Sequence, residues 1–146
     1  RGNRDYDWTM VWHGLSCISE YARVDNGQFR FMKRNLPGPF TFILQASSRV
    51  PVKALGRRKT VAVRYPANNI PVAIVEGLGV PMVTASVKDP DEVTEYTTDP
   101  ELIHERYARQ VDAVIDGGYG SVVPTTLVDL ISGEPEILRE GGGNLA

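Results

Sequence analysis

The chain has 146 residues, of which 42% are hydrophobic and 23% charged, and its formal net charge is −2 at pH 7. These values are typical of one soluble globular domain with its own core. They give no overall case for a nucleic-acid binder, which is usually strongly basic, and no apolar run approaches the roughly 18 residues of a membrane helix. The single Cys17 excludes an internal disulfide and favours a cytoplasmic location.

The first third of the chain alternates strand and helix patterns. The predicted elements are a strand at Trp8–Trp12, a short helix at Leu15–Tyr21, a helix that Asp25 or Asn26 caps, and a strand at Phe40–Ala46. The chain opens without Met, almost directly in a strand. We therefore expect it to begin partway through something longer.

The run from Pro37 to Leu44, Pro-Gly-Pro-Phe-Thr-Phe-Ile-Leu, is the most informative stretch. Two prolines and a glycine fix a tight turn, and a strand rich in aromatic and β-branched residues follows. Thr41 stands at the start of that strand. Its hydroxyl can be aimed at a ligand, or it can simply cap the turn, and the motif alone leaves both interpretations open.

The middle of the chain predicts a strand, a helix and a strand. Thr60–Pro66 is a strand ended by proline, Asn68 or Asn69 caps a helix that Gly79 terminates, and Pro81–Ala85 is the next strand. This order is typical of α/β folding. Lys53, Arg57, Arg58, Lys59 and Arg64 lie close together in the sequence and leave a local basic groove open.

The region that follows is acidic. Lys88–Asp99 lacks apolar periodicity, so we expect a solvated, mobile loop whose carboxylates are plain surface charge. Thr98 and Glu101 predict a capping box for a helix around Pro100.

The last third is predicted to contain three strands. They are Val111–Ile115, Thr125–Ile131 and Pro135–Arg139, and the last two are joined by a turn at Ser132-Gly133. Between the first two, the glycines of 117–120 predict a turn with positive φ, but they are a weak signal for a phosphate loop.

Common catalytic templates are not found. His13 and His104 are far apart in the sequence, His104 is expected to be solvated, and Cys17 is expected to pack rather than react. With one Cys and two separated His, no metal site is predicted.

Short hydroxyl residues and arginines recur at strand ends instead. They are Thr41, Arg64, Thr84, Ser86, Thr125, Thr126 and Arg139. Ligands collect at strand ends in open α/β sheets, and hydroxyls with guanidinium groups recognise phosphate and carboxylate. Ordinary capping explains any one of them, whereas the recurrence favours an anionic ligand.

Five segments carry a resemblance to the YrdC/YciO family, in the family's order and spacing. They are Pro37–Leu44, Thr60–Pro66, Pro81–Ser86, Pro124–Asp129 and Leu138–Gly141. The chain most resembles the YciO-like branch. The resemblance implies an α/β (α+β) fold of the YrdC/RibB-like kind, in which a twisted mixed β-sheet flanked by helices surrounds a concave positive cavity. Residues 1–146 are then one YrdC-like domain, incomplete at its N-terminus.

The resemblance also implies a reaction. Threonylcarbamoyl-AMP synthases convert L-threonine, bicarbonate and ATP to threonylcarbamoyl-adenylate and pyrophosphate, for modification of tRNA adenosine 37. ATP would enter with Mg²⁺ as its substrate complex, and no tightly bound cofactor is expected. The alternative is a non-catalytic module of the YciO type that binds nucleotide or double-stranded RNA. No membrane partner is implied.

Six residues match family motif positions and are the expected nucleotide or substrate contacts. They are Thr41, Arg64, Ser86, Thr125, Thr126 and Arg139. The chain also departs from the pattern, because the family's Pro-Thr-Asp-Thr-x-Tyr-Gly-Leu segment and a clear Lys-x-Arg motif are not found in it. Ser86-Val-Lys88 stands where the synthases have Ser-Ala-Asn. We therefore expect weak ATP or AMP binding at best, and no adenylate formation, from residues 1–146 alone.

Overall fold

The computed structural model describes residues 8–12 and 14–146, which form two compact units. The first unit consists of Arg1–Ala85 together with Thr125–Ala146, and the second unit consists of Ser86–Pro124. The chain thus leaves the first unit after one strand and re-enters it just before another. None of the described helices is long and apolar enough to cross a membrane.

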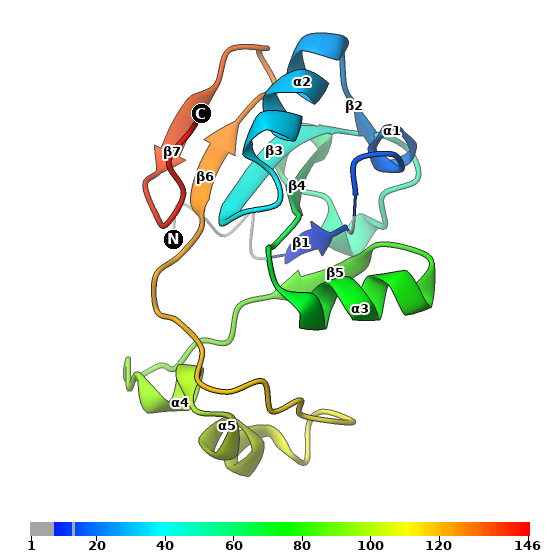
Figure 1. Ribbon diagram of the computed structural model, residues 1–146. Helices are drawn as coiled ribbons and strands as arrows, with labels where there is room; N and C mark the ends of the chain where they lie inside the picture. Colours follow the sequence, from blue (N-terminus) through cyan, green and yellow to red (C-terminus); the bar gives the residue numbers. More distant parts are fainter. Residues whose placement is uncertain (1–7, 13) are drawn as a thin grey trace. The chain divides into compact units, whose positions relative to one another are not determined.

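The first unit is built on a mixed sheet (Figure 1). Its strands are β1 Trp8–Val11, β2 Ala22–Arg23, β3 Phe40–Ala46, β4 Thr60–Arg64, β5 Met82–Ala85, β6 Thr126–Asp129 and β7 Glu136–Arg139. The order is β5-β1-β4-β3-β6-β7, and β2 pairs with β3. β1 is parallel to β4 and β3 is parallel to β6, while the other pairs are antiparallel. The predicted mixed α/β sheet is confirmed.

The helices of the first unit are α1 Ile18–Tyr21, α2 Asn26–Asn35 and α3 Asn69–Leu78, with 3₁₀ turns at Val52–Ala54 and Arg57–Lys59. Two of the three begin and end where local chemistry predicts, whereas α1 is shorter than the predicted Leu15–Tyr21 and has no side-chain cap. Asp25 caps α2 in a capping box with Gln28. Asn68 caps α3, and Gly79 ends it at a φ of 73°, a conformation that favours glycine.

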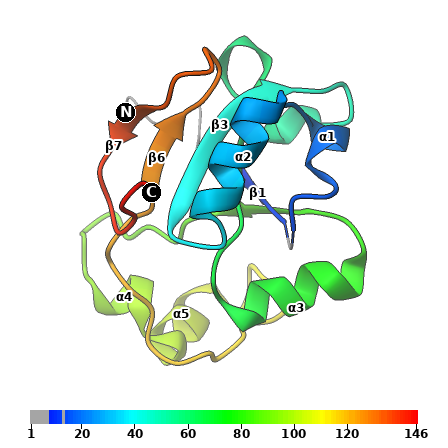
Figure 2. The same ribbon diagram turned by 45° about the horizontal axis from the view of Figure 1, so that its top comes forward.

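The core lies around β3, where six of seven residues are buried. Phe42 is fully buried and packs against Phe31 edge-on and Phe40 face-on, with ring centroids 6.0 and 5.6 Å apart. α2 lies across β3 in Figure 2 and contributes Met32 to the same core. The sequence between the Pro-Gly-Pro turn and Ala46 therefore forms the buried centre of the sheet.

The strand–helix–strand segment differs from the parallel unit that its order suggests. β4 runs parallel to β1, but β5 runs antiparallel to β1. Consequently, β4 and β5 run in opposite directions, and their C-terminal residues pair with opposite ends of β1: Arg64 with Val11, and Ala85 with Trp8.

The second unit contains two helices, α4 Glu95–Thr98 and α5 Pro100–Tyr107, and no strand. The strand predicted at Val111–Ile115 is wrong. Both of its end residues are exposed, so no apolar partner holds this segment as a strand. The positive φ predicted in the glycine turn is found at Gly118, at 88°.

Asp99, rather than Thr98, caps α5. The Asp99 carboxylate accepts from the backbone N–H of Glu101. The Thr98 hydroxyl instead donates to the carbonyl of Thr94, inside α4. The cap therefore lies one residue later than predicted and is a single hydrogen bond rather than the predicted capping box, because Thr98 already bonds within the preceding turn.

Asp89 contradicts the prediction that the acidic segment carries only surface charge. Its side chain is 1% exposed and forms an ion pair with Arg106. It also accepts from the backbone N–H groups of Asp91 and Val93. The Arg106 guanidinium in turn lies over the ring of Tyr96, 4.2 Å from its centroid. We call this arrangement the Asp89 clasp.

Candidate functional site: a cation and hydroxyl cluster at the sheet edge

Four predicted site residues lie at one edge of the sheet in the first unit. Thr41 is near the start of β3, and Thr125 precedes β6, which is parallel to β3. Arg64 ends β4 and Arg139 ends β7, and each of these strands runs antiparallel to its neighbour β3 or β6. The starts of β3 and β6 therefore meet the ends of β4 and β7 at one edge, because β4 and β7 run opposite to the parallel pair β3 and β6.

Three of the four are joined directly by hydrogen bonds. The hydroxyl oxygens of Thr41 and Thr125 are 2.6 Å apart. Arg139 donates from Nη2 to the Thr125 hydroxyl at 3.0 Å, and from Nε and Nη2 to the Thr125 carbonyl at 3.1 and 2.8 Å. Because the Thr125 hydroxyl accepts a hydrogen bond from Arg139, it can donate its own hydrogen bond to the Thr41 hydroxyl. The Thr41 hydroxyl is then left to donate to a ligand.

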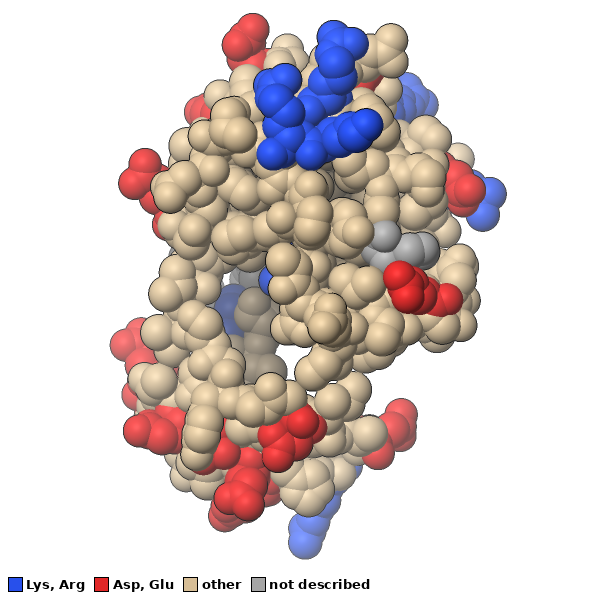
Figure 3. Space-filling model, in the orientation of Figure 1, with Lys and Arg blue, Asp and Glu red and all other residues tan. Residues whose placement is uncertain are grey.

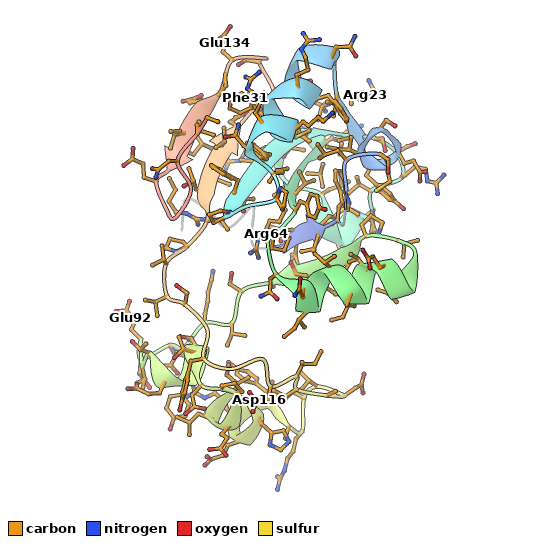
Figure 4. The ribbon with its side chains drawn as sticks, viewed as in Figure 1. Arg23, Phe31, Arg64, Glu92, Asp116 and Glu134 are labelled. Atoms are coloured by element: carbon orange, nitrogen blue, oxygen red, sulfur yellow. The ribbon has the colours of Figure 1, made fainter. Side chains whose placement is uncertain are left out.

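Arg64 adds a second positive charge, and Figure 4 labels it at the end of β4. Burial lowers the pKa of Arg64, and the charge of Arg139 lowers it further. Its Nε is buried and has no hydrogen-bond partner among the described residues. A guanidinium remains protonated near neutral pH even so. Two like charges and an unused donor therefore make this edge favourable for an anion.

Thr126 has a different role from the predicted ligand contact. Its buried hydroxyl donates to the Gly143 carbonyl at 2.7 Å and accepts from the backbone N–H groups of Gly141 and Gly143. One donor and two acceptor positions are all that a threonine hydroxyl offers. Thr126 therefore holds the C-terminal segment against β6.

Ser86 was expected at this edge because it follows a strand end, but the direction of β5 does not support that reason. It follows β5, whose last residue pairs with the start of β1, whereas Arg64 pairs with the end of β1. Ser86 is also the first residue of the second unit. Its role at the site stays a prediction. Thr84, another strand-end hydroxyl, pairs with Thr9 across β1 and β5, with 2.8 Å between the two oxygens.

The remaining candidates behave as ordinary structural residues. His104 is exposed on α5, as expected. Cys17 packs beside the core, and burial raises the pKa of its thiol, so it is a poor nucleophile. His13 lies outside the described residues. Within the described part of the chain, no group of three or more His, Cys, Asp or Glu side chains could hold a metal ion.

The hydrogen bonds between Gly143 and Thr126 were missed by sequence reasoning. An added Cβ at Gly143 would lie 2.5 Å from the Phe40 ring. This glycine therefore lets the C-terminal segment pass close to the strand that carries Thr41. The repeated Gly141-Gly142-Gly143 is the signal that could have found it.

Comparisons with known proteins connect this geometry to a family. Residues 4–141 match the model of the Sua5_yciO_yrdC family, described as "Telomere recombination". The YciO protein of Escherichia coli K12 is uncharacterised and 44% identical over 142 residues, which cover 96% of this chain and 68% of that protein. An uncharacterised protein of Haemophilus influenzae is 42% identical, covering 97% and 69%.

A threonylcarbamoyl-AMP synthase of Pyrococcus abyssi is 33% identical over 111 residues, covering 75% of this chain and 32% of the synthase. Among solved structures, Escherichia coli YciO matches with a TM-score of 0.84 at 44% identity, covering 94% of this chain and 67% of that one. Pyrococcus abyssi Sua5 complexed with L-threonine matches with a TM-score of 0.78 at 28% identity, covering 94% and 41%. The chain therefore belongs to the Sua5/YciO/YrdC family, within which it is more similar to these YciO-type proteins than to the threonylcarbamoyl-AMP synthases to which it is related.

Proposed function

We propose that the sheet-edge cluster binds the phosphate groups of ATP. The observation that carries this proposal is the pair of arginines, Arg64 and Arg139, with the linked hydroxyls of Thr41 and Thr125 beside Arg139. An anion placed there offsets both the burial and the repulsion from Arg139 that lower the Arg64 pKa. Guanidinium and hydroxyl donors are also the groups that phosphate oxygens accept from.

The reaction proposed for this site is that of the related synthases. An oxygen of threonylcarbamate, formed from L-threonine and bicarbonate, attacks the α-phosphorus of ATP, and the bond to pyrophosphate breaks on the opposite side. The products are threonylcarbamoyl-adenylate, for modification of tRNA adenosine 37, and pyrophosphate. Mg²⁺ enters with the triphosphate as part of the substrate.

This chemistry asks the protein mainly for alignment and charge neutralisation. Alignment of two reactants alone can supply roughly 7–11 kcal/mol of a barrier. Arginines that face the phosphate stabilise the charge that develops on its oxygens. Support for threonine as the co-substrate is the Pyrococcus abyssi relative, whose structure is complexed with L-threonine.

The test is threonine-dependent release of pyrophosphate from ATP in the presence of bicarbonate, assayed on the full-length gene product, with ATP binding measured in parallel by calorimetry. Arg139→Ala removes three donated hydrogen bonds and a charge, and it should weaken ATP binding about 10- to 100-fold. The control Arg109→Ala, an exposed arginine of the second unit, should leave binding unchanged. Equal affinity of Arg139→Ala and the unaltered chain would overturn the site.

A second candidate function is non-catalytic binding of nucleotide or double-stranded RNA. It is favoured by a basic face on α2, formed by the exposed Arg30, Lys33 and Arg34. Figure 3 shows Lys and Arg side chains gathered over this helix. α2 carries no acidic residue to offset them. ATP binding without pyrophosphate release would favour this candidate.

The RNA part of this alternative has its own test. If α2 contacts RNA phosphates, replacing Arg30 and Lys33 together with Ala should reduce the salt dependence of duplex RNA binding by about two released counterions. ATP affinity should not change, because neither residue belongs to the sheet-edge cluster. A salt dependence equal to that of the unaltered chain would exclude α2 as the contact face.

A further inference from the structure

The end of the sheet opposite the sheet-edge cluster carries a second group of positive charges. At this end β3 finishes at Ala46, β4 begins at Thr60, and β2 pairs with the end of β3. Four exposed cations lie on β2 and on the segment between β3 and β4, and we call them the basic end: Arg23, Lys53, Arg58 and Lys59. Arg64 ends β4, about 13 Å from Thr60 at the usual rise of a strand. Figure 4 labels Arg23 and Arg64 in these separate places.

Little negative charge offsets the basic end. Between Asp25 and Glu76 the sequence contains nine Lys and Arg and not one Asp or Glu. Asp25 itself is engaged in the capping box of α2. Among the described residues, Arg23, Arg58 and Lys59 form no ion pair. The positive charge here is therefore uncompensated and attracts a polyanion.

The loop that carries Arg58 and Lys59 is held in an unfavourable backbone conformation. Their φ angles are 55° and 57°, in the left-handed region that most side chains seldom adopt. The Gln45 side-chain amide donates to the carbonyls of both residues, at 3.3 and 3.2 Å. Gln45 also pairs in register with Arg23 on β2. The backbone of three cationic residues thus surrounds Gln45. Strained residues braced in this way are concentrated at sites that bind ligands.

An exposed aromatic ring lies at the same end of the sheet. Trp8 begins β1 and is 42% exposed. β1 runs parallel to β4, with Met10 opposite Val63. Two residues back in this register, Trp8 falls one residue from the start of β4. The Lys53 ammonium lies 5.5 Å from the centre of the Trp8 ring. The ring therefore offers a surface for stacking beside positive charge.

We propose that the basic end and Trp8 together bind a single strand of nucleic acid. Arg23, Arg58 and Lys59 contact its phosphates, and the Trp8 ring stacks on one of its bases. The strands β1, β4, β3 and β2 are successive neighbours, so Trp8 and Arg23 stand three strand spacings, about 14 Å, apart. A short strand can engage both. Cations with an exposed aromatic ring favour a single strand over a duplex, whose bases are already stacked on one another.

The first measurement is the affinity of the full chain for labelled eight-nucleotide strands, oligo-dT and oligo-U, at several salt concentrations. Replacing Arg58 and Lys59 together with Asn removes two charges, and asparagine tolerates the left-handed region, so the loop should keep its fold. The slope of log affinity against log salt should become shallower by about 1.4, since each phosphate contact with a single strand contributes about 0.7. Arg109→Asn, at an exposed arginine of the second unit, is the control and should leave the slope unchanged.

The second measurement tests stacking on Trp8. Trp8→Ala should weaken binding about 5- to 100-fold, and Trp8→Phe should recover most of the loss because it keeps a ring. Tyr119→Ala removes a ring that is 80% exposed in the second unit and should have no effect. The strand should quench the fluorescence of the unaltered chain but not that of Trp8→Phe, whose remaining Trp12 is buried.

Three results would overturn the proposal. They are an unchanged salt slope in the folded Arg58→Asn and Lys59→Asn variant, an unchanged affinity in Trp8→Ala, and equal quenching by an eight-base-pair duplex. Tighter binding of oligo-U than of oligo-dT would support the proposal and identify RNA as the strand. ATP affinity should be the same in all of these variants, because they lie away from the sheet-edge cluster. Failure here would therefore leave the ATP site standing.

Discussion

The two units of this chain are held together by different forces. The first unit surrounds its sheet with buried apolar side chains, whereas no hydrophobic residue of the second unit is fully buried. The one residue that is buried in the second unit is Asp89. An apolar core stabilises the first unit by area removed from water. The second unit depends instead on the Asp89 clasp and on helix caps, which are sensitive to pH and to single polar substitutions.

Charge divides along the same boundary. The second unit contains nine Asp and Glu against three Lys and Arg, while the first contains nine against thirteen. A net charge near zero for the whole chain thus hides a basic unit and an acidic one. The sheet-edge arginines and the α2 basic face both belong to the basic unit, which is where an anionic ligand is attracted.

The largest effect that distinguishes the units should come from the core. Phe42→Ala leaves a cavity between Phe31 and Phe40, and it should lower the free energy of unfolding by about 3–5 kcal/mol. Tyr119→Ala, in the second unit, removes a ring that is 80% exposed and should change it by less than about 0.5 kcal/mol. Urea unfolding followed by circular dichroism measures both. Similar losses would show that the second unit has a hidden core.

A smaller effect is expected where the C-terminal segment crosses the sheet. Gly143→Ala forces a Cβ against the buried Phe40 ring and should cost about 1–3 kcal/mol of unfolding free energy. Gly77→Ala makes the same chemical change inside α3, where nothing lies within 4 Å of the new Cβ. It should stabilise by about 0.5–1 kcal/mol, since alanine favours a helix. The same denaturant curves separate the two signs, and equal shifts would contradict the close approach.

The smallest effect concerns the second unit alone. Asp89→Asn should speed hydrogen exchange at the Val93 amide, whereas Asp91→Asn, at an exposed neighbour, should not. Hydrogen bonds from Arg106 and Val93 lower the pKa of Asp89. Its stabilising contribution is therefore complete above the unfolded pKa and is lost as the pH falls through the lower folded pKa.

That loss with falling pH is a second readout of the same clasp. The pH dependence of Val93 exchange should show protection disappearing at strongly acidic pH in the unaltered chain. In Asp89→Asn the acid-dependent step should be gone, because no titrating carboxylate remains at that position. An acid step of unchanged size in this variant would show that another group holds the segment.

Local sequence signals predicted most of the first unit. The β3 boundaries, the α3 caps and the turn at Gly133 follow from residues adjacent in the chain, where proline, asparagine and glycine act within one turn. The direction of β5 could not be predicted this way, because it depends on pairing with β1, far away in the sequence.

The same distinction applies to the site and to the second unit. Thr41, Thr125 and Arg139 lie at one edge because of strand register, and their positions at strand ends suggested this. The Thr126 hydroxyl, by contrast, has all its hydrogen-bonding positions filled by glycines 15 and 17 positions later in the chain, which no local signal indicates. Asp89 looks like any carboxylate in an acidic run. Only the position of Arg106 on α5 and of the Val93 amide explains its burial.

The insertion of the second unit between β5 and β6 has a consequence for chain continuity. A peptide bond cut near Gly118 would separate β6 and β7 from the rest of the sheet covalently, but β6 would still pair with β3 along four residue positions and bury Leu127 and Val128. The exposed, glycine-rich tip at 117–120 is a favourable place for such a cut. The two fragments should therefore remain associated and should reassemble when mixed, so that the chain can be used as a split protein whose halves each carry part of the arginine pair.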